Sequence, residues 1–288
     1  MTIKHLVLSG GGPTMIQTIG SIQHLEEQHF LNLNDIESIY GTSAGTLVGI
    51  LICLKFDWET INDYIIKRPW QDVFKIQIQN IFDAYTKRGI YDVKVIEKCL
   101  KPLFDAKDIS LSITLEEFYE YSKIELHFFT FEVNDFQLID ISYLTHPKLL
   151  LLNAIQMTCG LPVLLTPFLS EGKCYIDGGI VCNYPLKYCV ESGKNADEIL
   201  GLKNNYNINK KNVVDDESTI LDFILTIVFK IIYSIAVKHI HPIIKYELLC
   251  DTEHITFQFL RTSLTSLEVR KDLLNSGIQS GQKFLSSL

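Results

Sequence analysis

Two strand–turn–helix units fill the first 55 residues, and they constrain the fold of this chain more than any other feature. Leu6–Leu8 form a short apolar run that ends at glycines, and from about Thr14 to Gln28 isoleucine and leucine recur at helical spacing. The order repeats with a strand at Ile36–Tyr40, a tight turn at 41–45 and an apolar helix at Thr46–Leu54. Successive βα units need parallel strands with helices against the faces of the sheet. We therefore predict an α/β fold with a mainly parallel sheet flanked by helices.

The rest of the chain divides into regions of different pattern, which we expect to form one domain over residues 1–288. Amphipathic stretches indicate a helical insertion at about 57–123, after which strands and a helix return. The motifs that carry chemistry all lie within 5–188, and a C-terminal part follows at 218–288. In that part we expect Ile255–Phe259 to form the last strand, before a closing helix.

The charge of the chain and its amino-terminal residues bear on its partners and its location. The formal net charge is −8 and no block of lysine and arginine is present, whereas contacts to phosphates need a concentrated basic face. We therefore expect no nucleic-acid partner. Met1–His5 run straight into Leu6–Leu8 without the apolar core and cleavage site of a signal peptide, which predicts a cytoplasmic protein that is not secreted.

A G-x-S-x-G sequence connects the second predicted strand to the helix that follows it. Gly41, Ser43 and Gly45 occupy its fixed positions. In such an elbow the serine takes a strained conformation that lifts its hydroxyl clear of the backbone, so the residues two before and two after it must be small. The helix amino terminus also stabilises negative charge that develops beside the serine. Ser43 is therefore a candidate nucleophile.

Two further glycine motifs stand at the ends of predicted strands. Gly10–Gly12 follow the first strand, where exposed backbone N–H groups can hold the oxyanion of a tetrahedral intermediate. Met15 occupies the third glycine position of a dinucleotide-binding G-x-G-x-x-G, where a helix must pack closely on the strand, which argues against that interpretation. Asp177 ends another short strand, and Gly178 and Gly179 after it free the backbone and leave the carboxylate open to a cleft.

Taken in order, these three elements resemble the patatin-like phospholipase family: a glycine-rich oxyanion loop, then G-x-S-x-G, then D-G-[AG]. Ala154–Pro162, Lys87–Asp92 and Leu264–Phe284 are also similar to segments of that family, so the resemblance spans nearly the whole chain. By position, it implies Ser43 as nucleophile and Asp177 as general base in a dyad that needs no histidine. It further implies Gly10, Gly11 and Gly12 as oxyanion donors. Gly41, Gly45, Gly178 and Gly179 are the glycines that support the serine and aspartate motifs.

The resemblance implies a lipid acyl hydrolase with a phospholipid or acylglycerol substrate, a patatin-like fold, and no metal or organic cofactor. The chain departs from the family pattern after its triple glycine, where a basic residue and then glycine are usual. Thr14 and Met15 occupy those two positions. The departure motivates one alternative, a catalytically silent or weakly active lipid-binding protein, although such a protein has no need to keep both members of the dyad.

A second alternative is a conventional Ser-His-Asp hydrolase of the α/β-hydrolase type, which needs a histidine after the nucleophile to relay the proton. None of the candidates lies in a recognisable catalytic loop, and only one βα unit precedes the elbow, whereas several strands precede it in the usual order. We therefore expect structural or surface roles for all of them. The candidates are His127, His146, His239, His241 and His254.

The most apolar segment of the chain is residues 220–240. Polar residues recur every fourth position along it, which draws one polar stripe on an otherwise apolar helix and argues against a membrane-spanning segment. Between Phe223 and Tyr246 there are three lysines, two histidines and no acidic residue. We favour a core helix whose stripe faces water. The alternative is an interfacial helix that makes peripheral contact with a membrane.

Overall fold

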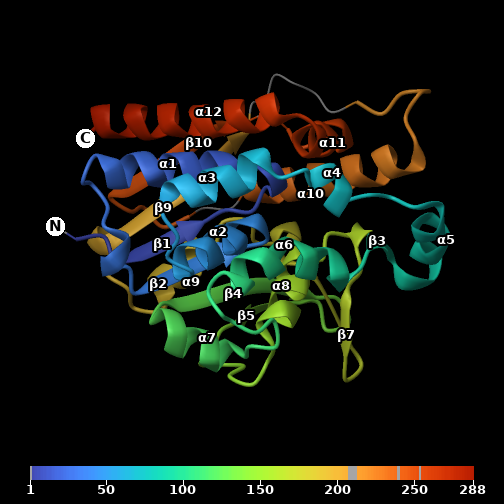
Figure 1. The fold of residues 1–288 in the computed structure, drawn as a ribbon, viewed down its shortest axis with the longest axis horizontal. Helices are drawn as coiled ribbons and strands as arrows, with labels where there is room; N and C mark the ends of the chain where they lie inside the picture. The colour runs from blue at the N-terminus through green and yellow to red at the C-terminus, as the bar shows by residue number, and fades with distance from the viewer. Residues whose placement is uncertain (1, 207–212, 239–240, 253) are drawn as a thin grey trace.

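The computed structural model describes residues 2–206, 213–238, 241–252 and 254–288, and a twisted β-sheet with helices around it forms its centre (Figure 1). The strand order in the large sheet is β10-β9-β1-β2-β4-β8-β7, and β5 pairs with β4. The first five strands in this order run parallel, β5 and β8 each pair antiparallel with β4, and β7 pairs antiparallel with β8. The strands are β1 His5–Leu8, β2 Ser38–Thr42, β4 Glu125–Glu132, β5 Gln137–Ile141, β7 Phe168–Ser170, β8 Lys173–Asp177, β9 Ile199–Tyr206 and β10 Tyr246–Thr252. The predicted α/β fold with a mainly parallel sheet is confirmed.

Helices alternate with these strands and cover the sheet on both sides (Figure 1). Residues 57–123 are mainly helical, as predicted, and include only the short strand β3 Gly89–Tyr91, which pairs with β6 Val163–Leu165. The helices are α1 Met15–Glu27, α2 Ala44–Cys53, α3 Trp58–Lys67, α4 Trp70–Val73, α5 Ile78–Lys87, α6 Val93–Asp105, α7 Leu115–Ser122, α8 Leu151–Cys159, α9 Leu186–Glu191, α10 Ile220–Lys238, α11 Phe257–Thr265 and α12 Leu267–Ser286.

The central strands are buried on both faces, as expected for a parallel sheet. Alternate residues of β1 and β2 belong to two separate apolar clusters: Leu6 and Ile39 join the large cluster, while Val7 and Tyr40 join a smaller one with residues of α9. The core therefore forms two layers with the sheet between them, and the carboxyl ends of β1 and β2 emerge at the same edge.

The ends of β2 and β8 meet on one side of β4, and this meeting positions the candidate site. β5 pairs with residues 128–132 of β4, so β2 and β8 must share the other side of that strand. On that side β2 ends with Thr42 opposite Phe129, and antiparallel β8 ends with Asp177 opposite Thr130. The pairing register therefore brings the residue after Thr42 close to Asp177.

α12 packs along α1, which ties the end of the chain to its first helix (Figure 1). Two glycines allow the close approach of these helices. A Cβ atom on Gly20 would lie 2.2 Å from the Leu274 carbonyl oxygen, and one on Gly277 would lie 2.0 Å from the Gln17 carbonyl oxygen. Any larger residue at either position would push the helices apart.

One predicted element is wrong. Ile255–Phe259 do not form the last strand, because Thr256 caps the amino terminus of α11, whose helix begins at Phe257. The last strand is instead β10, which lies at the edge of the sheet beside β9. β10 alternates buried and accessible residues, including exposed Asp251, so it lacks the continuous apolar run by which the central strands were recognised.

The predicted apolar helix at 220–240 corresponds to α10, although residues 239–240 lie outside the described part of the chain. The expectation that its polar stripe faces water holds only in part: Lys230 is exposed, but Thr226 of the stripe is buried beside Leu225, while Phe223 and Ile227 are exposed. None of the helices within the described ranges is long and apolar enough to cross a bilayer.

Candidate active site

Ser43 stands at the turn between β2 and α2, where it takes φ 52° and ψ −123°. A positive φ is unusual for a residue with a side chain, and this strained conformation is the one that the elbow motif predicts. Ser43 is also the residue immediately before the first turn of α2. Its hydroxyl therefore lies close to the positive end of the helix dipole.

Gly41 and Gly45 flank the elbow because neither position has room for a side chain. A Cβ atom on Gly41 would lie 2.8 Å from the Thr46 amide nitrogen, and one on Gly45 would lie 2.4 Å from the Leu8 carbonyl oxygen. The spacing of glycines in the motif thus follows from the tight packing of the turn, at Gly41 against the first turn of α2 and at Gly45 against β1.

Thr158 supports the elbow from α8. Its hydroxyl accepts a hydrogen bond of 2.9 Å from the Ser43 backbone N–H and donates one of 2.6 Å to the Phe129 carbonyl on β4. In the sequence, Thr158 stands out only as part of the family-like segment Ala154–Pro162. A single threonine carries no signal of such a contact, because the partners come from three separate elements.

Asp177 ends β8 and is buried, with 4% of its surface exposed. Burial raises the pKa of its carboxyl to about 6, although interaction with the Ser43 hydroxyl and the Gly179 amide opposes the increase. The Gly179 N–H donates to the Asp177 carboxylate at 2.7 Å. A Cβ atom on Gly178 would lie 2.3 Å from the Phe129 carbonyl oxygen, so glycine is required for this turn to lie against β4.

The glycine loop after β1 lies beside this pair. The Gly10 N–H donates to the Asn183 carbonyl at 3.0 Å, so that amide is already engaged. Gly11 and Gly12 line the same cavity as Ser43 and Asp177. Gly12 takes φ +55°, a conformation that favours glycine. Of the three predicted oxyanion donors, Gly11 and Gly12 therefore face the site, and Gly10 secures the loop.

A network of three side chains fixes the loop where the family pattern has a basic residue. Thr14 is buried, and its hydroxyl donates to the Gly11 carbonyl at 3.2 Å. The Asn204 amide donates to the Thr14 hydroxyl and to the Gly10 carbonyl, both at 2.9 Å. The Asn183 amide also donates to the Gly10 carbonyl, at 3.0 Å. Asn204 was not found from the sequence, because it reaches the loop only through the pairing of β9 with β1.

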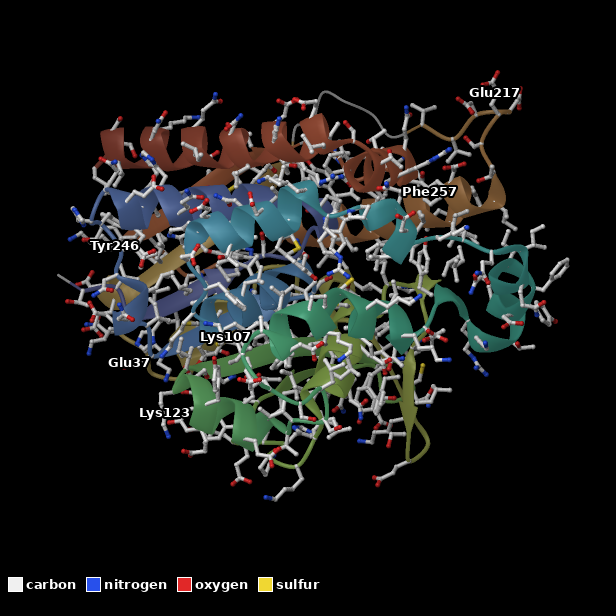
Figure 2. The ribbon with its side chains drawn as sticks, in the orientation of Figure 1. Glu37, Lys107, Lys123, Glu217, Tyr246 and Phe257 are labelled. Atoms are coloured by element: carbon white, nitrogen blue, oxygen red, sulfur yellow. The ribbon has the colours of Figure 1, made fainter. Side chains whose placement is uncertain are left out.

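A cavity of about 740 Å³, the site cavity, contains these groups. Ser43, Asp177, Gly11 and Gly12 lie in its wall, and Asn183, Lys75, His254 and Arg270 are among its other polar residues. The remainder is mainly apolar and comes from the helices around the sheet, for example Leu51 of α2. Figure 2 shows Phe257, which also lines the cavity, toward the end of the long axis opposite to Tyr246 and Glu37. The arrangement can hold an apolar chain beside a serine hydroxyl, a buried carboxylate and the backbone of Gly11 and Gly12.

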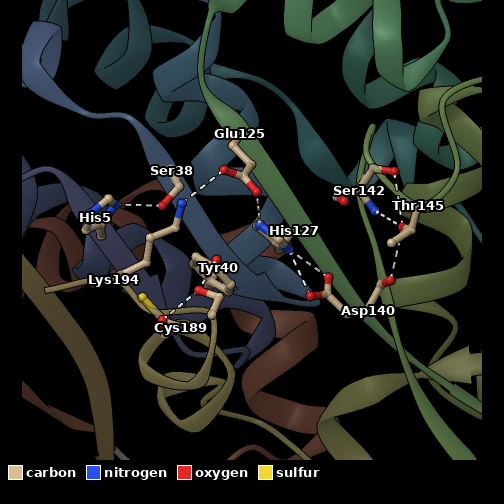
Figure 3. Close-up of polar contacts among 11 residues, drawn as sticks. His5, Ser38, Tyr40, Glu125, His127, Asp140, Ser142, Thr145, Cys189 and Lys194 are labelled. Carbon is tan, nitrogen blue, oxygen red and sulfur yellow. Dashed lines mark hydrogen bonds and ion pairs between the residues drawn. The ribbon is translucent and has the colours of Figure 1, made fainter. Parts of the chain in front are cut away.

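His127 belongs to a separate ionic cluster on the side of the sheet covered by α9 (Figure 3). Its ring stacks on Tyr40 with centroids 3.9 Å apart, and its nitrogens contact the carboxylates of Asp140 and Glu125, each at 2.9 Å. Lys194 contacts the other oxygen of Glu125 at 3.1 Å. Both ring nitrogens are occupied by carboxylates, so His127 has a structural role, as predicted.

The other candidate histidines are dispersed. His254 lines the site cavity, where its ring packs against Tyr206 and Tyr233. His146 contacts the neighbouring Thr145 hydroxyl at 2.9 Å, and the ring of His241 lies edge-on to Tyr184. The fifth candidate, His239, lies outside the described residues.

Comparison with known proteins agrees with this geometry. The family described as patatin-like phospholipase matches residues 6–190, well over half of the chain, and the match includes the elbow, the glycine loop and the Asp177 turn. The chain belongs to the patatin-like phospholipase family. As a member of this family, the chain is a lipid hydrolase.

Two viral proteins are similar to this member of the family. The probable lipid hydrolase 463L of Invertebrate iridescent virus 6 is 24% identical over 217 residues, which cover 73% of this chain and 73% of that protein. The uncharacterized protein R571 of Acanthamoeba polyphaga mimivirus is 25% identical over 186 residues, covering 64% of this chain and 60% of that protein. Among solved structures, VipD from Legionella pneumophila matches with a TM-score of 0.59 at 17% identity, over 100% of this chain and 67% of VipD. The similarity to VipD shows a shared fold and nothing further.

Proposed function

We propose that the chain is a serine acyl hydrolase that cleaves acyl esters of phospholipids or acylglycerols, with Ser43 as nucleophile and Asp177 as general base. The observation that carries the proposal is the meeting of a strained serine and a buried carboxylate at one point of the sheet, inside a largely apolar cavity. Both partners come from motifs that serve this chemistry in the family to which the chain belongs.

In the proposed reaction the Ser43 hydroxyl oxygen attacks the acyl carbonyl carbon while its proton passes to the Asp177 carboxylate. The Gly11 and Gly12 amides hold the negative charge that forms on the carbonyl oxygen. The intermediate then collapses to an acyl-enzyme, and the proton on Asp177 passes to the leaving alcohol. Water, deprotonated by Asp177 in the same way, releases the fatty acid and restores Ser43.

The burial of Asp177 supports its role as base. A carboxylate in water is a weak base, with a pKa near 3.9, but burial raises the pKa of Asp177 to about 6. Transfer of the serine proton to such a carboxylate becomes feasible while the oxyanion is stabilised at the same moment. The contact of the Gly179 amide with one carboxylate oxygen orients the group toward Ser43.

Product analysis tests the proposal. Purified protein is incubated with mixed micelles of phosphatidylcholine and detergent, and released fatty acid is measured by mass spectrometry beside the Ser43→Ala variant. We expect fatty acid release by the natural chain and a loss of at least about 10³-fold in the variant. Equal release by both proteins, or no release from phospholipid or triacylglycerol by a folded natural chain, would contradict it.

A further inference from the structure

α5 presents its apolar side to solvent. Asn80, Asp83 and Ala84 are the half-buried residues of this helix, whereas its large apolar side chains point outward. The outward residues recur at a spacing of three and four, which places them on one side of the helix. They are Ile78, Ile81, Phe82 and Tyr85, exposed by 75%, 59%, 71% and 93%, and we call them the α5 face.

The helix that carries the α5 face is well formed. Gln77 and Asn80 make reciprocal contacts at its amino terminus, and Lys87 pairs with Asp83 one turn earlier at 2.8 Å. The apolar side chains are therefore held outward by a regular helix. An amphipathic helix of a soluble protein normally buries its apolar side, and a contiguous exposed apolar surface indicates an interaction partner.

The α5 face lies next to residues that line the site cavity. Phe74, Lys75 and Ile76, which lead directly into α5, line that cavity, and Phe229 and Tyr233 of α10 line it from another side. α10 carries a second outward row, formed by Ile220, Phe223, Ile227 and Ile231, each at least 42% exposed. Figure 1 shows α5 and α10 toward the same end of the long axis.

The charge around the α5 face is opposite in sign to that of the whole chain. Residues 75–88 contain Lys75, Lys87 and Arg88 against Asp83 alone, three positive charges and one negative, whereas the chain has a net charge of −8. Lys230 and Arg261, on α10 and α11, are exposed as well, whereas the exposed acidic residues Asp215, Asp216 and Glu217 precede α10, so the positive balance belongs to α5 and the residues beside it. A symmetric contact with a second copy would bring these like charges together and would cover the cavity mouth, which argues against a dimer through this face.

We propose that the α5 face inserts into the surface of a lipid bilayer that contains anionic lipids, with the outer row of α10 as a second contact. The choice of a bilayer as partner rests on the proposed function, because a lipid hydrolase must meet its substrate in a membrane. Insertion would bury the exposed apolar side chains, while the surrounding lysines and arginines would contact lipid head groups. The mouth of the site cavity would then face the lipid.

Vesicle binding tests the inference separately from catalysis. All proteins carry Ser43→Ala, so the vesicles stay intact, and binding to vesicles of phosphatidylcholine with one fifth phosphatidylserine is measured by sedimentation. We expect Ile81→Ser with Phe82→Ser to weaken binding by about tenfold or more. The matched control is Phe136→Ser with Leu144→Ser, an equally exposed phenylalanine and aliphatic residue elsewhere on the surface, and it should bind as the parent does.

A fluorescent residue reports insertion directly. Tryptophan in Phe82→Trp should shift to shorter emission wavelengths on vesicles and be quenched by brominated lipid, whereas tryptophan in Phe136→Trp should not. Binding that is unchanged by the α5 substitutions would overturn the inference. A natural dimer that these substitutions convert to monomer, with vesicle binding preserved, would overturn it also and assign the face to a second copy.

Hydrolysis of a soluble short-chain ester, measured with Ser43 restored, distinguishes a failure of the proposed hydrolase activity from a failure of the proposed membrane contact. The α5 variant should hydrolyse this ester as the natural chain does, because α5 does not contact the ester. If the natural chain does not hydrolyse it, the proposed function fails while vesicle binding still decides the α5 face. If the α5 variant loses this activity as well as vesicle binding, the effect is on the fold and the inference is overturned.

Discussion

Individual residues explain why part of the site could be predicted from sequence and part could not. Ser43, Asp177 and their flanking glycines stand out because steric and chemical demands restrict those positions to one or two residue types. The side chains of Thr158 and Asn204 each make two hydrogen bonds to distant segments of the chain, so their residue types follow no local pattern. The engagement of the Gly10 amide by Asn183 likewise depends on the tertiary fold.

The pKa of Asp177 predicts the pH dependence of catalysis. A base must be deprotonated, and burial places the pKa of this carboxyl at about 6. On a soluble ester, kcat/KM should therefore be level above about pH 7 and should fall about tenfold per unit below about pH 5. Measurement between these limits and beyond locates the transition. A transition near pH 7 that disappears in a histidine variant would contradict the assignment of the base.

The His127 cluster predicts a pH dependence of stability. Burial alone would lower the pKa of His127, but Asp140 and Glu125 outweigh that effect and raise it above 6.5. The stabilisation is complete below about 6.5 and is lost as pH rises through the raised value. The pKa of Glu125 is lowered to about 2, chiefly by His127, so its contribution is lost as pH falls from about 4.5 toward 2.

His127→Gln should therefore destabilise the protein by about 2 kcal/mol near pH 6, because Asp140 and Glu125, both half-buried, lose the imidazolium between them, although Lys194 still contacts Glu125. The loss should shrink near pH 9, where the natural histidine is itself neutral. Urea unfolding at both values measures the difference. Lys194, Tyr40, His5 and Cys189 are the other titratable groups near the cluster, and the variant retains all four (Figure 3). An equal loss at both pH values would show that packing on Tyr40 is the main contribution.

At the scale of elements, strong local patterns were sufficient for most helices and strands, and tertiary context decided the rest. The alternating βα order predicted the parallel sheet because it admits few arrangements. β10 was missed because an edge strand needs only one well-buried face, and its accessible residues include Asp251. α5 illustrates the opposite case: its amphipathic pattern is clear from the sequence, but its orientation, apolar side outward, is visible only in the structure.

The loop after β1 offers a test of Thr14, one of the two departures from the family pattern. Asn204→Ala removes the amide that donates to both the Thr14 hydroxyl and the Gly10 carbonyl. The backbone amides of Gly11 and Gly12 should then be less well oriented toward the oxyanion. We expect kcat on a soluble ester to fall by about 10- to 100-fold with little change in KM, somewhat less than the loss of an oxyanion donor. Asn205→Ala is the matched control, because that neighbouring side chain is exposed and contacts Asp251.

The hydroxyl of Thr14 should account for the same effect. Thr14→Val should behave like Asn204→Ala, and Thr14→Ser, which keeps the hydroxyl, should restore most of the activity. If Thr14→Val is as active as Thr14→Ser, the hydrogen bonds of the Thr14 hydroxyl do not contribute to catalysis.

At the scale of the whole molecule, one edge of the sheet brings together Ser43, Asp177 and the glycine loop, and the helices around them form a mainly apolar cavity. The match to the patatin-like phospholipase family extends over 6–190, and the helices beyond that range complete the cavity wall through α10 and α11. The central claim is that Asp177 activates Ser43 without a histidine. Among the candidate histidines that the structure describes, His254 lines the same cavity, so it provides the sharpest comparison.

The most direct test is the rate of labelling by a fluorophosphonate in folded natural protein, Ser43→Ala, Asp177→Asn and His254→Gln. Asp177→Asn keeps the shape of the side chain and removes the proton acceptor. We predict no labelling of Ser43→Ala, a rate lowered by about 10² to 10⁴ in Asp177→Asn, and a nearly natural rate in His254→Gln. A labelling rate that survives in Asp177→Asn but is lost in His254→Gln would contradict the dyad and establish a conventional triad.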